Sequence, residues 1–204
     1  MAAPYIVAIA GGSASGKTTM ANRLIEEFGP QLCDVLAQDN YYIDQSSQFD
    51  HDGGNVNFDH PDALEFTLMA KHLASAKSQE SFPLPHYDFS KHIRKDQTTL
   101  FRPKKIIFVD GILILSQQYL LKYFDLMIFV ECPESIRFER RLKRDIEQRG
   151  RTEQGVREQF EKQVAPMHNL FVEPGKKLAH VVVTVQNFDQ SVEEIKSLIH
   201  KAIL

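Results

Sequence analysis

The chain has 204 residues, 43% of them hydrophobic and 25% charged, which is the composition of one folded domain and excludes a largely disordered chain. Its formal net charge is −3, and a mildly acidic chain does not coat nucleic acid through bulk charge. No apolar run approaches the roughly 18 residues of a membrane span, and the apolar N-terminal residues lack the basic leader of a secretory signal. We therefore expect a single domain over residues 1–204, located in the cytoplasm, with neither nucleic acid nor a membrane as partner.

Short apolar runs alternate with helical patterns along the chain. The runs predict strands at 5–10, 33–37, 106–109, 126–130 and 180–185, and the patterns predict helices at 17–28, 61–77, 116–122, 134–149, 153–172 and 189–204. This alternation predicts an α/β fold with a mostly parallel central sheet. Two further extended segments, 82–89 and 97–101, predict a small β-ribbon within about 82–101. The polar stretch 39–60, which carries Gly53 and Gly54, predicts a functional loop because it follows a strand.

Residues 11–18 (GGSASGKT) match the phosphate-binding pattern G-x-x-x-x-G-K-[ST] at every fixed position, between a predicted strand and a predicted helix. The glycines let successive N–H groups point at one phosphate, and the helix N-terminus adds a favourable field. Lys17 is expected to place its ammonium on the transferring phosphate, and the Thr18 hydroxyl is suited to bind Mg²⁺. The predicted nucleotide site comprises Gly11, Gly12, Ser13, Ala14, Ser15, Gly16, Lys17, Thr18 and Thr19.

Two carboxylates stand at the ends of predicted strands. Asp110 follows the apolar run 106–109, as a Walker B acid in a Mg²⁺ shell does, although an Asp at this position can also cap a turn. Asp39 follows the run 33–37, where a carboxylate could take the proton of an acceptor hydroxyl. On its own, an Asp in this position is more often a turn residue.

Residues 137–151 carry seven basic and three acidic side chains, a local charge of +4. Arg137, Arg141 and Arg144 have the spacing that places side chains on one face of a helix. Such charge runs usually mark a solvated helix face, but beside a phosphate site arginines can neutralise the charge that develops during phosphoryl transfer. Gly150, between two arginines, offers a hinge where a lid could bend.

Further blocks follow the phosphate loop in a fixed order and span about residues 5 to 185 together with it. They are 38–42 (QDNYY), 57–63 (NFDHPDA), 87–89 (YDF) with His92 and Arg94, 110–113 (DGIL), 140–146 (RRLKRDI), 149–151 (RGR) and 164–167 (VAPM). This ordered set resembles the uridine-cytidine kinase family of P-loop nucleoside kinases. The resemblance implies a three-layer P-loop kinase domain with a mostly parallel central sheet, a small β-ribbon and a helical lid over about 141–160.

The same resemblance implies an activity, namely phosphorylation of the 5′-hydroxyl of uridine and cytidine to UMP and CMP in pyrimidine salvage. The implied phosphate donor is ATP (or GTP) with Mg²⁺, and the implied assembly is a homotetramer. Asp39 would be the general base, Lys17 and Arg144 would act with it in catalysis, and Thr18, Asp39 and Asp110 would hold the metal. The implied triphosphate ligands in the lid are Arg144, Arg149 and Arg151. The implied nucleoside ligands are Phe58, Asp59, Tyr87, His92, Arg141 and Gln159.

The sequence leaves two other functions open. One is a sibling P-loop kinase that acts on another small hydroxyl substrate, such as phosphoribulose or pantothenate. The other is a non-catalytic nucleotide-binding regulator, which would have no need of a base such as Asp39. Phe58, Tyr87 and His92 also fit ordinary packing. The chain departs from the family at Asp110, where Glu is usual, and at 184–187, near the expected purine site.

Overall fold

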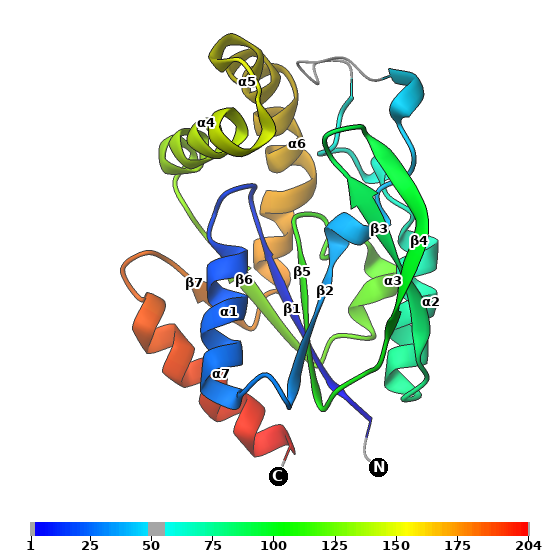
Figure 1. Cartoon of the computed structure of the whole chain (residues 1–204). Helices are drawn as coiled ribbons and strands as arrows, with labels where there is room; N and C mark the ends of the chain where they lie inside the picture. Colours follow the sequence, from blue (N-terminus) through cyan, green and yellow to red (C-terminus); the bar gives the residue numbers. More distant parts are fainter. Residues whose placement is uncertain (1–2, 49–55, 204) are drawn as a thin grey trace.

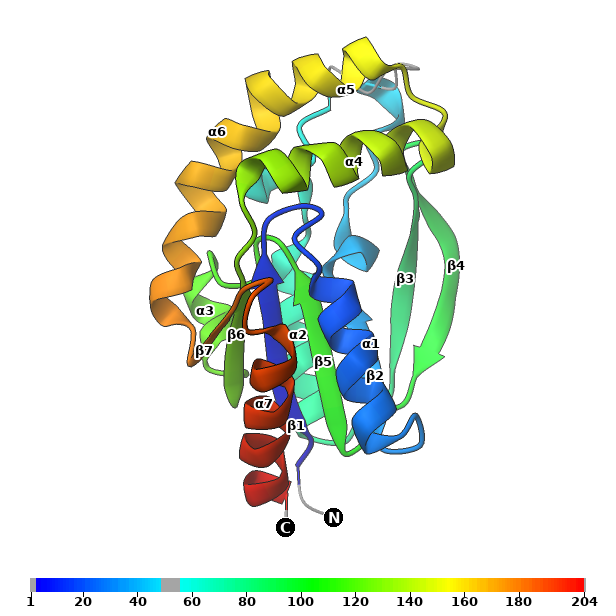
Figure 2. The same ribbon diagram turned by 90° about the vertical axis from the view of Figure 1, so that its left-hand side faces the viewer.

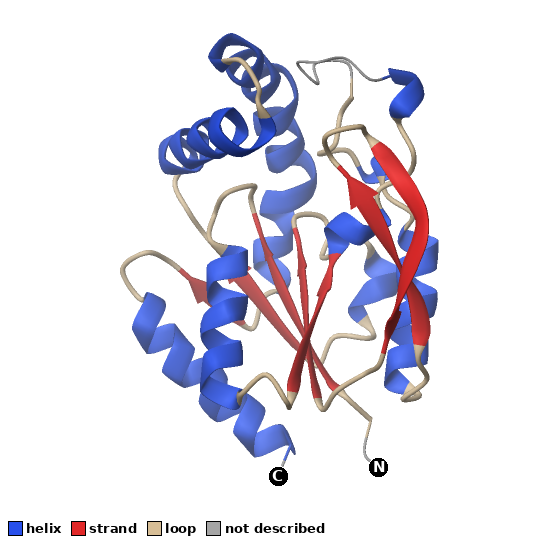
Figure 3. Ribbon diagram, in the orientation of Figure 1, coloured by secondary structure: helices blue, strands red, loops and turns tan. Residues whose placement is uncertain are grey.

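The computed structural model describes residues 3–48 and 56–203. At its centre is a five-stranded sheet in the order β2-β5-β1-β6-β7, in which all neighbouring strands are parallel. Helices cover both faces of this sheet, so that the domain has three layers with the sheet in the middle (Figures 1 and 3). The strands are β1 (Tyr5–Gly11), β2 (Cys33–Ala37), β5 (Ile106–Gly111), β6 (Leu126–Val130) and β7 (Val181–Val183). The predicted parallel α/β fold is confirmed, with a last strand shorter than the predicted 180–185.

Burial on both faces explains why the strands are almost wholly apolar. Along β1, Ile6 and Ala8 alternate with Val7 and Ile9, and each pair faces a different core. The first core contains side chains of α2 (Phe66–Lys77) and α3 (Gln118–Leu121), and the second contains side chains of α1 (Lys17–Phe28) and α7 (Phe188–Ile203). The sheet is therefore a rigid middle layer whose carboxyl edge can carry a site. No helix in the described part of the chain is long and apolar enough to cross a membrane.

The predicted helix 61–77 is interrupted. A 3₁₀ turn covers Pro61–Ala63, Leu64 forms an isolated antiparallel bridge with Tyr42, and α2 begins only at Phe66. The reason is competition for backbone hydrogen bonds, because Ile43 N donates to Ala63 O at 3.0 Å and Glu65 N donates to Tyr41 O at 2.8 Å. These bonds attach the start of α2 to the loop that follows β2.

A two-stranded antiparallel ribbon, separate from the main sheet, consists of β3 (Phe82–Asp88) and β4 (Ile93–Phe101). It lies within the predicted range, but its second strand starts four positions before the predicted 97–101. On the other side of the molecule α4 (Glu134–Arg149) crosses above the carboxyl ends of the central strands (Figure 2).

After α4 the chain turns at Gly150 and continues as one long helical segment. It runs through α5 (Glu153–Gln159), a π-helical stretch (Phe160–Val164), α6 (Ala165–Met167) and a second π-helical stretch (His168–Val172), and then a 3₁₀ segment (Glu173–Leu178). The predicted helix 153–172 is therefore helical throughout but not uniformly α. Pro166, which lacks a backbone N–H, lies between the two π-helical stretches.

Candidate active site

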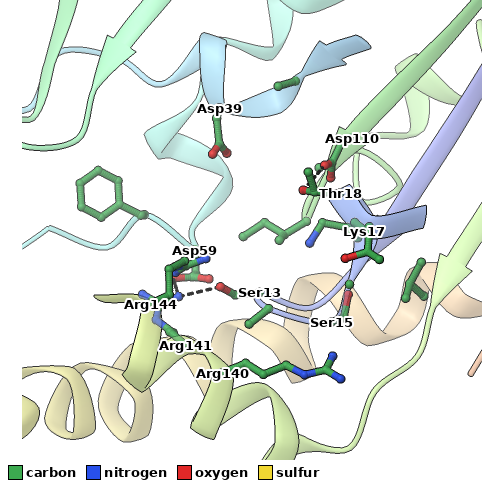
Figure 4. Close-up of a pocket in the computed structure, with 18 of the residues that line it drawn as sticks. Ser13, Ser15, Lys17, Thr18, Asp39, Asp59, Asp110, Arg140, Arg141 and Arg144 are labelled. Carbon is green, nitrogen blue, oxygen red and sulfur yellow. Dashed lines mark hydrogen bonds and ion pairs between the residues drawn. The ribbon is translucent and has the colours of Figure 1, made fainter. Parts of the chain in front are cut away.

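A cavity of about 950 Å³ opens at the carboxyl ends of β1, β2 and β5, beneath α4. The loop between β1 and α1, the 3₁₀ turn η1 (Gln38–Tyr41) after β2, the end of β5, the turn of the ribbon and the lid helices all contribute to its walls. In Figure 4, Asp39 enters this space from one side, Thr18 and Asp110 from a second, and the arginines of α4 from a third. Open parallel sheets bind ligands at this edge.

The loop between β1 and α1 has a backbone that only certain residues can adopt. Gly11 has a φ of 145°, and a Cβ there would lie 2.4 Å from the carbonyl oxygen of Val130. Gly16, which caps α1, has a φ of 108°, and Ala14 has a φ of 60°. These positive φ angles, and the absence of side chains at the glycines, allow successive backbone N–H groups to gather at the N-terminus of α1. This is the anion-binding geometry that the motif predicts.

Lys17 is folded back onto this loop. Its Nζ donates to Gly12 O at 2.9 Å, and only 9% of the residue is exposed. Burial lowers the pKa of the Lys17 ammonium, against the opposing charges of Asp110 and Asp39. The ammonium therefore rests on a neutral carbonyl that a phosphate oxygen can replace.

The residues predicted to bind a metal face the same cavity. Thr18 Oγ1 donates to Asp110 Oδ2 at 2.8 Å, and Asp39 lies opposite them (Figure 4). A hydroxyl and two carboxylates are hard oxygen ligands, which suit Mg²⁺. Within residues 3–48 and 56–203 no group of three or more His, Cys, Asp or Glu side chains could hold a metal ion unaided. Mg²⁺ here would also need phosphate oxygens, as it commonly does in kinases.

Asp39 is carried by η1 and exposed to the cavity. Desolvation between the cavity walls raises the pKa of Asp39, and the neighbouring Asp110 carboxylate adds to the effect. A carboxyl with a raised pKa is a stronger base once it is ionised. Arg94 of the ribbon stabilises the end of η1, because its Nη2 donates to Tyr41 O at 2.8 Å and its Nε donates to Tyr42 O at 2.9 Å.

Asp59, Arg141 and Gln159 form a buried polar group, each at most 5% exposed. Arg141 Nη1 donates to Ser13 Oγ at 3.0 Å and lies 3.8 Å from Asp59 Oδ2, while Arg141 Nη2 donates to Gln159 Oε1 at 3.1 Å. One guanidinium thus joins the phosphate-binding loop to Asp59 across the cavity. A small substrate held by Asp59 would lie next to the nucleotide.

Aromatic rings form the wall beyond Asp59. Phe58 packs edge-to-face against His92, with ring centroids 4.9 Å apart, and both line the cavity. Tyr42 and Phe89 line it as well, whereas Tyr87 packs against Tyr42, Phe58 and Phe89 without lining it. His92 has a φ of 55°, a strained conformation of the kind that concentrates at functional sites. The wall suits a flat ring with polar edges.

Arg140 and the lid residues Arg144, Arg149 and Arg151 line the cavity from above, together with Arg141. Arg149 also lies 4.8 Å from the Phe89 ring centroid and so connects the lid to the aromatic wall. Arg137, which was expected on the same helical face, lies elsewhere. It is 2% exposed, and a Cβ on Gly12 would lie 2.8 Å from its Nη1, so it supports the loop from behind.

The structure gathers most of the predicted site residues around one cavity. The predicted residues that line it are Ser13, Ala14, Ser15, Gly16, Lys17, Thr18, Thr19, Asp39, Phe58, Asp59, His92, Asp110, Arg141, Arg144, Arg149, Arg151 and Gln159. Gly11 and Gly12 shape the loop beneath it. Gly53 and Gly54 of the predicted functional loop lie outside the described residues.

Sequence reasoning missed several residues of the cavity wall. Tyr42 and Phe89 belong to the sequence blocks 38–42 and 87–89, and Arg140 belongs to the basic segment 137–151. Their positions in these segments could have suggested them. Thr184 and Val185, of the segment 184–187 where the purine of a nucleotide was expected, line the cavity together with Phe188. No motif marks Phe188.

The parallel sheet, the phosphate loop at its carboxyl edge, the strand-end carboxylate and the arginine-bearing helix over the cavity define a P-loop kinase. A solved structure described as a possible uridine kinase from Bacillus stearothermophilus superposes with a TM-score of 0.63 at 18% identity and covers 90% of each chain, which shows a shared fold. The model of the phosphoribulokinase/uridine kinase family matches residues 6–191.

Two curated relatives are much closer in sequence. The uridine kinase of Clostridium perfringens is 40% identical over 183 residues, covering 90% of this chain and 88% of that protein. The uridine kinase of Proteus mirabilis is 42% identical over 182 residues, covering 87% and 85%. The chain belongs to the phosphoribulokinase/uridine kinase family.

Proposed function

We propose that the protein catalyses the ATP-dependent phosphorylation of the 5′-hydroxyl of uridine and cytidine, giving UMP and CMP. The observation that carries this proposal is one cavity in which Asp39 faces the phosphate loop and Arg141 joins that loop to Asp59. The similarity to two uridine kinases over most of the chain supports it.

The acceptor end of the cavity suits a ribonucleoside. Asp59 can accept hydrogen bonds from the ribose 2′- and 3′-hydroxyls, with Arg141 and Gln159 beside them. Phe58 and His92 would contact the pyrimidine ring, and Tyr87 stays a predicted contact to its edge. The 5′-hydroxyl then points toward Asp39, which accepts its proton.

Transfer needs little covalent chemistry from the protein. The 5′-oxygen forms a bond to the γ-phosphorus as the bond to the bridging oxygen breaks, and the electron pair leaves with ADP. Lys17 and Arg144 stabilise the charge on the transferring group, and Arg149 and Arg151 hold the rest of the triphosphate. Thr18, Asp39 and Asp110 would hold Mg²⁺, which neutralises charge on the phosphates when it is bound. The donor is ATP or GTP, with its purine near Thr184.

The decisive experiment measures phosphate transfer from ATP to a panel of acceptors. We expect turnover of uridine and cytidine, and rejection of 2′-deoxyuridine by roughly 10⁴-fold in kcat/KM, because a deoxy analogue leaves buried polar groups without partners. Phosphoribulose and pantothenate belong in the panel, since turnover of either one instead would replace this proposal by a sibling kinase. Equal kcat/KM for uridine and 2′-deoxyuridine would remove Asp59 from the ribose site.

The variant Asp39→Asn tests the base. It should lower kcat by about 10²- to 10⁴-fold, the usual contribution of a positioned base. Asp96→Asn, an exposed Asp on β4, is the matched control and should behave as wild type. A fully active Asp39→Asn enzyme would show that another group takes the proton.

We further propose a cytoplasmic homotetramer that acts in pyrimidine salvage, with Mg²⁺ required for turnover. Sedimentation velocity tests the assembly, and a single species of monomer mass at micromolar concentration would contradict it. Titration of the enzyme with EDTA, reversed by added Mg²⁺, tests the metal requirement.

A further inference from the structure

Asp145 of α4 is the most enclosed charged residue of the lid, with no exposed surface. Four guanidinium groups surround its carboxylate. Arg144 donates through Nε and contacts through Nη2, both 2.8 Å from Oδ1, and Arg149 Nη1 is 3.4 Å from the same oxygen. On the other side, Arg141 Nε and Arg151 Nη1 lie 3.4 Å and 3.8 Å from Oδ2. One buried negative charge therefore faces four positive ones.

The contacts differ in strength between the two oxygens. Oδ1 has short, charge-assisted contacts to Arg144. Oδ2 is buried without a hydrogen-bond partner among the described residues and is neighboured by Arg141 and Arg151 at longer range. Arg144 is thus oriented by Asp145 through short contacts. Arg141 and Arg151 face Asp145 at longer range and also donate to Gln159 Oε1, at 3.1 and 2.5 Å.

The backbone of Asp145 also shapes the lid. Its carbonyl oxygen accepts from the N–H of Gly150, which caps α4 in a left-handed conformation, and from Arg151 N at 3.1 Å. The backbone of Asp145 therefore fixes the turn that carries Arg149 and Arg151, and its carboxylate faces the side chains of the same two arginines.

The charges around Asp145 do not balance. Partial desolvation and the nearby charge of Arg144 lower the pKa of Arg149, and Asp145 opposes this effect. Asp59, 3.8 Å from Arg141 Nη1, and Asp39, whose charge acts on Arg149, offset part of the repulsion between the guanidiniums. Without the Asp145 carboxylate the guanidiniums would repel one another more strongly. With a triphosphate in the cavity they would have another anion to face.

We propose that Asp145 is a positioning residue that substitutes for a phosphate group in the nucleotide-free enzyme. Its carboxylate holds Arg141, Arg144, Arg149 and Arg151 over the cavity, so that an arriving triphosphate meets an ordered lid. The inference rests on the proposed use of Arg144, Arg149 and Arg151 against the triphosphate and of Arg141 beside the ribose. It adds a role for a residue that does not itself line the cavity.

The test compares wild type with the nearly isosteric variant Asp145→Asn. In the nucleotide-free variant, amides of residues 141–160 should exchange hydrogen much faster than in wild type, while those of β1 keep their protection. The non-hydrolysable β,γ-imido analogue of ATP should restore the protection. In the variant, part of the binding free energy of ATP must be used to order the lid. KM for ATP should therefore rise roughly tenfold, while kcat stays within about twofold of wild type. Equal lid protection in both proteins, or a loss confined to kcat, would overturn the proposal.

Two controls separate charge from general damage. Glu153→Gln removes a carboxylate from an exposed Glu153–Arg157 pair on α5 and should change neither lid protection nor KM. Asp145→Glu keeps the negative charge and should retain most of the lid protection, and it decides the question if Asp145→Asn does not fold. Loss of lid protection in Asp145→Glu with β1 intact would count against the proposal.

The exchange measurement also separates this inference from the proposed function. It needs no acceptor and no turnover, only the nucleotide analogue. A wild-type enzyme that phosphorylates no nucleoside would refute the proposed reaction and leave the role of Asp145 to be decided by lid protection alone.

Discussion

Asp39 shows how one residue is tuned by its surroundings. The cavity walls and the carboxylate of Asp110 raise its pKa, while Arg149 and Lys17 oppose the shift. A base must be ionised, so kcat/KM for uridine should fall as the pH drops through this raised pKa, at a higher pH than an ordinary Asp would cause. A pH profile of kcat/KM measures this. An activity that stays constant down to the pKa of a free Asp would contradict it.

The same shift predicts an effect on stability. Because the folded state binds the Asp39 proton more tightly than the unfolded chain, the stability associated with this group is lost as the pH rises through the folded-state pKa. Asp39→Asn, which carries no charge, should therefore have a higher Tm than wild type at neutral pH. The difference should shrink at acid pH, where wild-type Asp39 is protonated. Thermal melts of both proteins across this range decide it.

At the scale of elements, the observed helix boundaries agree with the predicted ones where a local residue ends the helix. The bounds of α1 and α4 match the predictions because Gly29 and Gly150 end them with positive φ. The predicted helix 61–77 is wrong in its first turns, because backbone groups near Tyr42 compete for its hydrogen bonds. The competing backbone groups belong to a segment distant in sequence. The pattern of apolar residues within the helix carries no information about them.

Gly11 and Gly150 differ in how much a substitution by Ala should destabilise the protein. Gly11→Ala places a Cβ 2.4 Å from a β6 carbonyl oxygen, whereas at Gly150 no atom lies within 4 Å of a Cβ. We expect Gly11→Ala to cost about 2–3 kcal/mol and lower Tm by about 4–12 °C. Gly150→Ala should cost only about 1 kcal/mol, from its left-handed φ of 65°. Equal Tm values for the two variants would refute this difference.

At the scale of the whole molecule, the net charge of −3 conceals a local excess of positive charge. Arg140, Arg144, Arg149 and Arg151 line a single cavity, so the cavity attracts anions although the chain is acidic. KM for ATP should therefore rise several-fold between about 0.1 and 1 M salt, as the screening length falls from about 10 to 3 Å. KM for uridine, which is neutral, should change little. A parallel rise of both constants would indicate a general salt effect.

The amino-acid sequence by itself determined the phosphate loop, the parallel α/β architecture and the strand-end position of Asp110. These features are encoded within about ten neighbouring residues, through glycine conformations and apolar runs. Only the tertiary structure decided that Arg141 reaches Asp59, that Arg137 packs behind Gly12, and that Asp145 lies buried among four guanidiniums. Each of these depends on how α4 lies across the edge of the sheet. That placement results from long-range packing, which no local pattern of residues specifies.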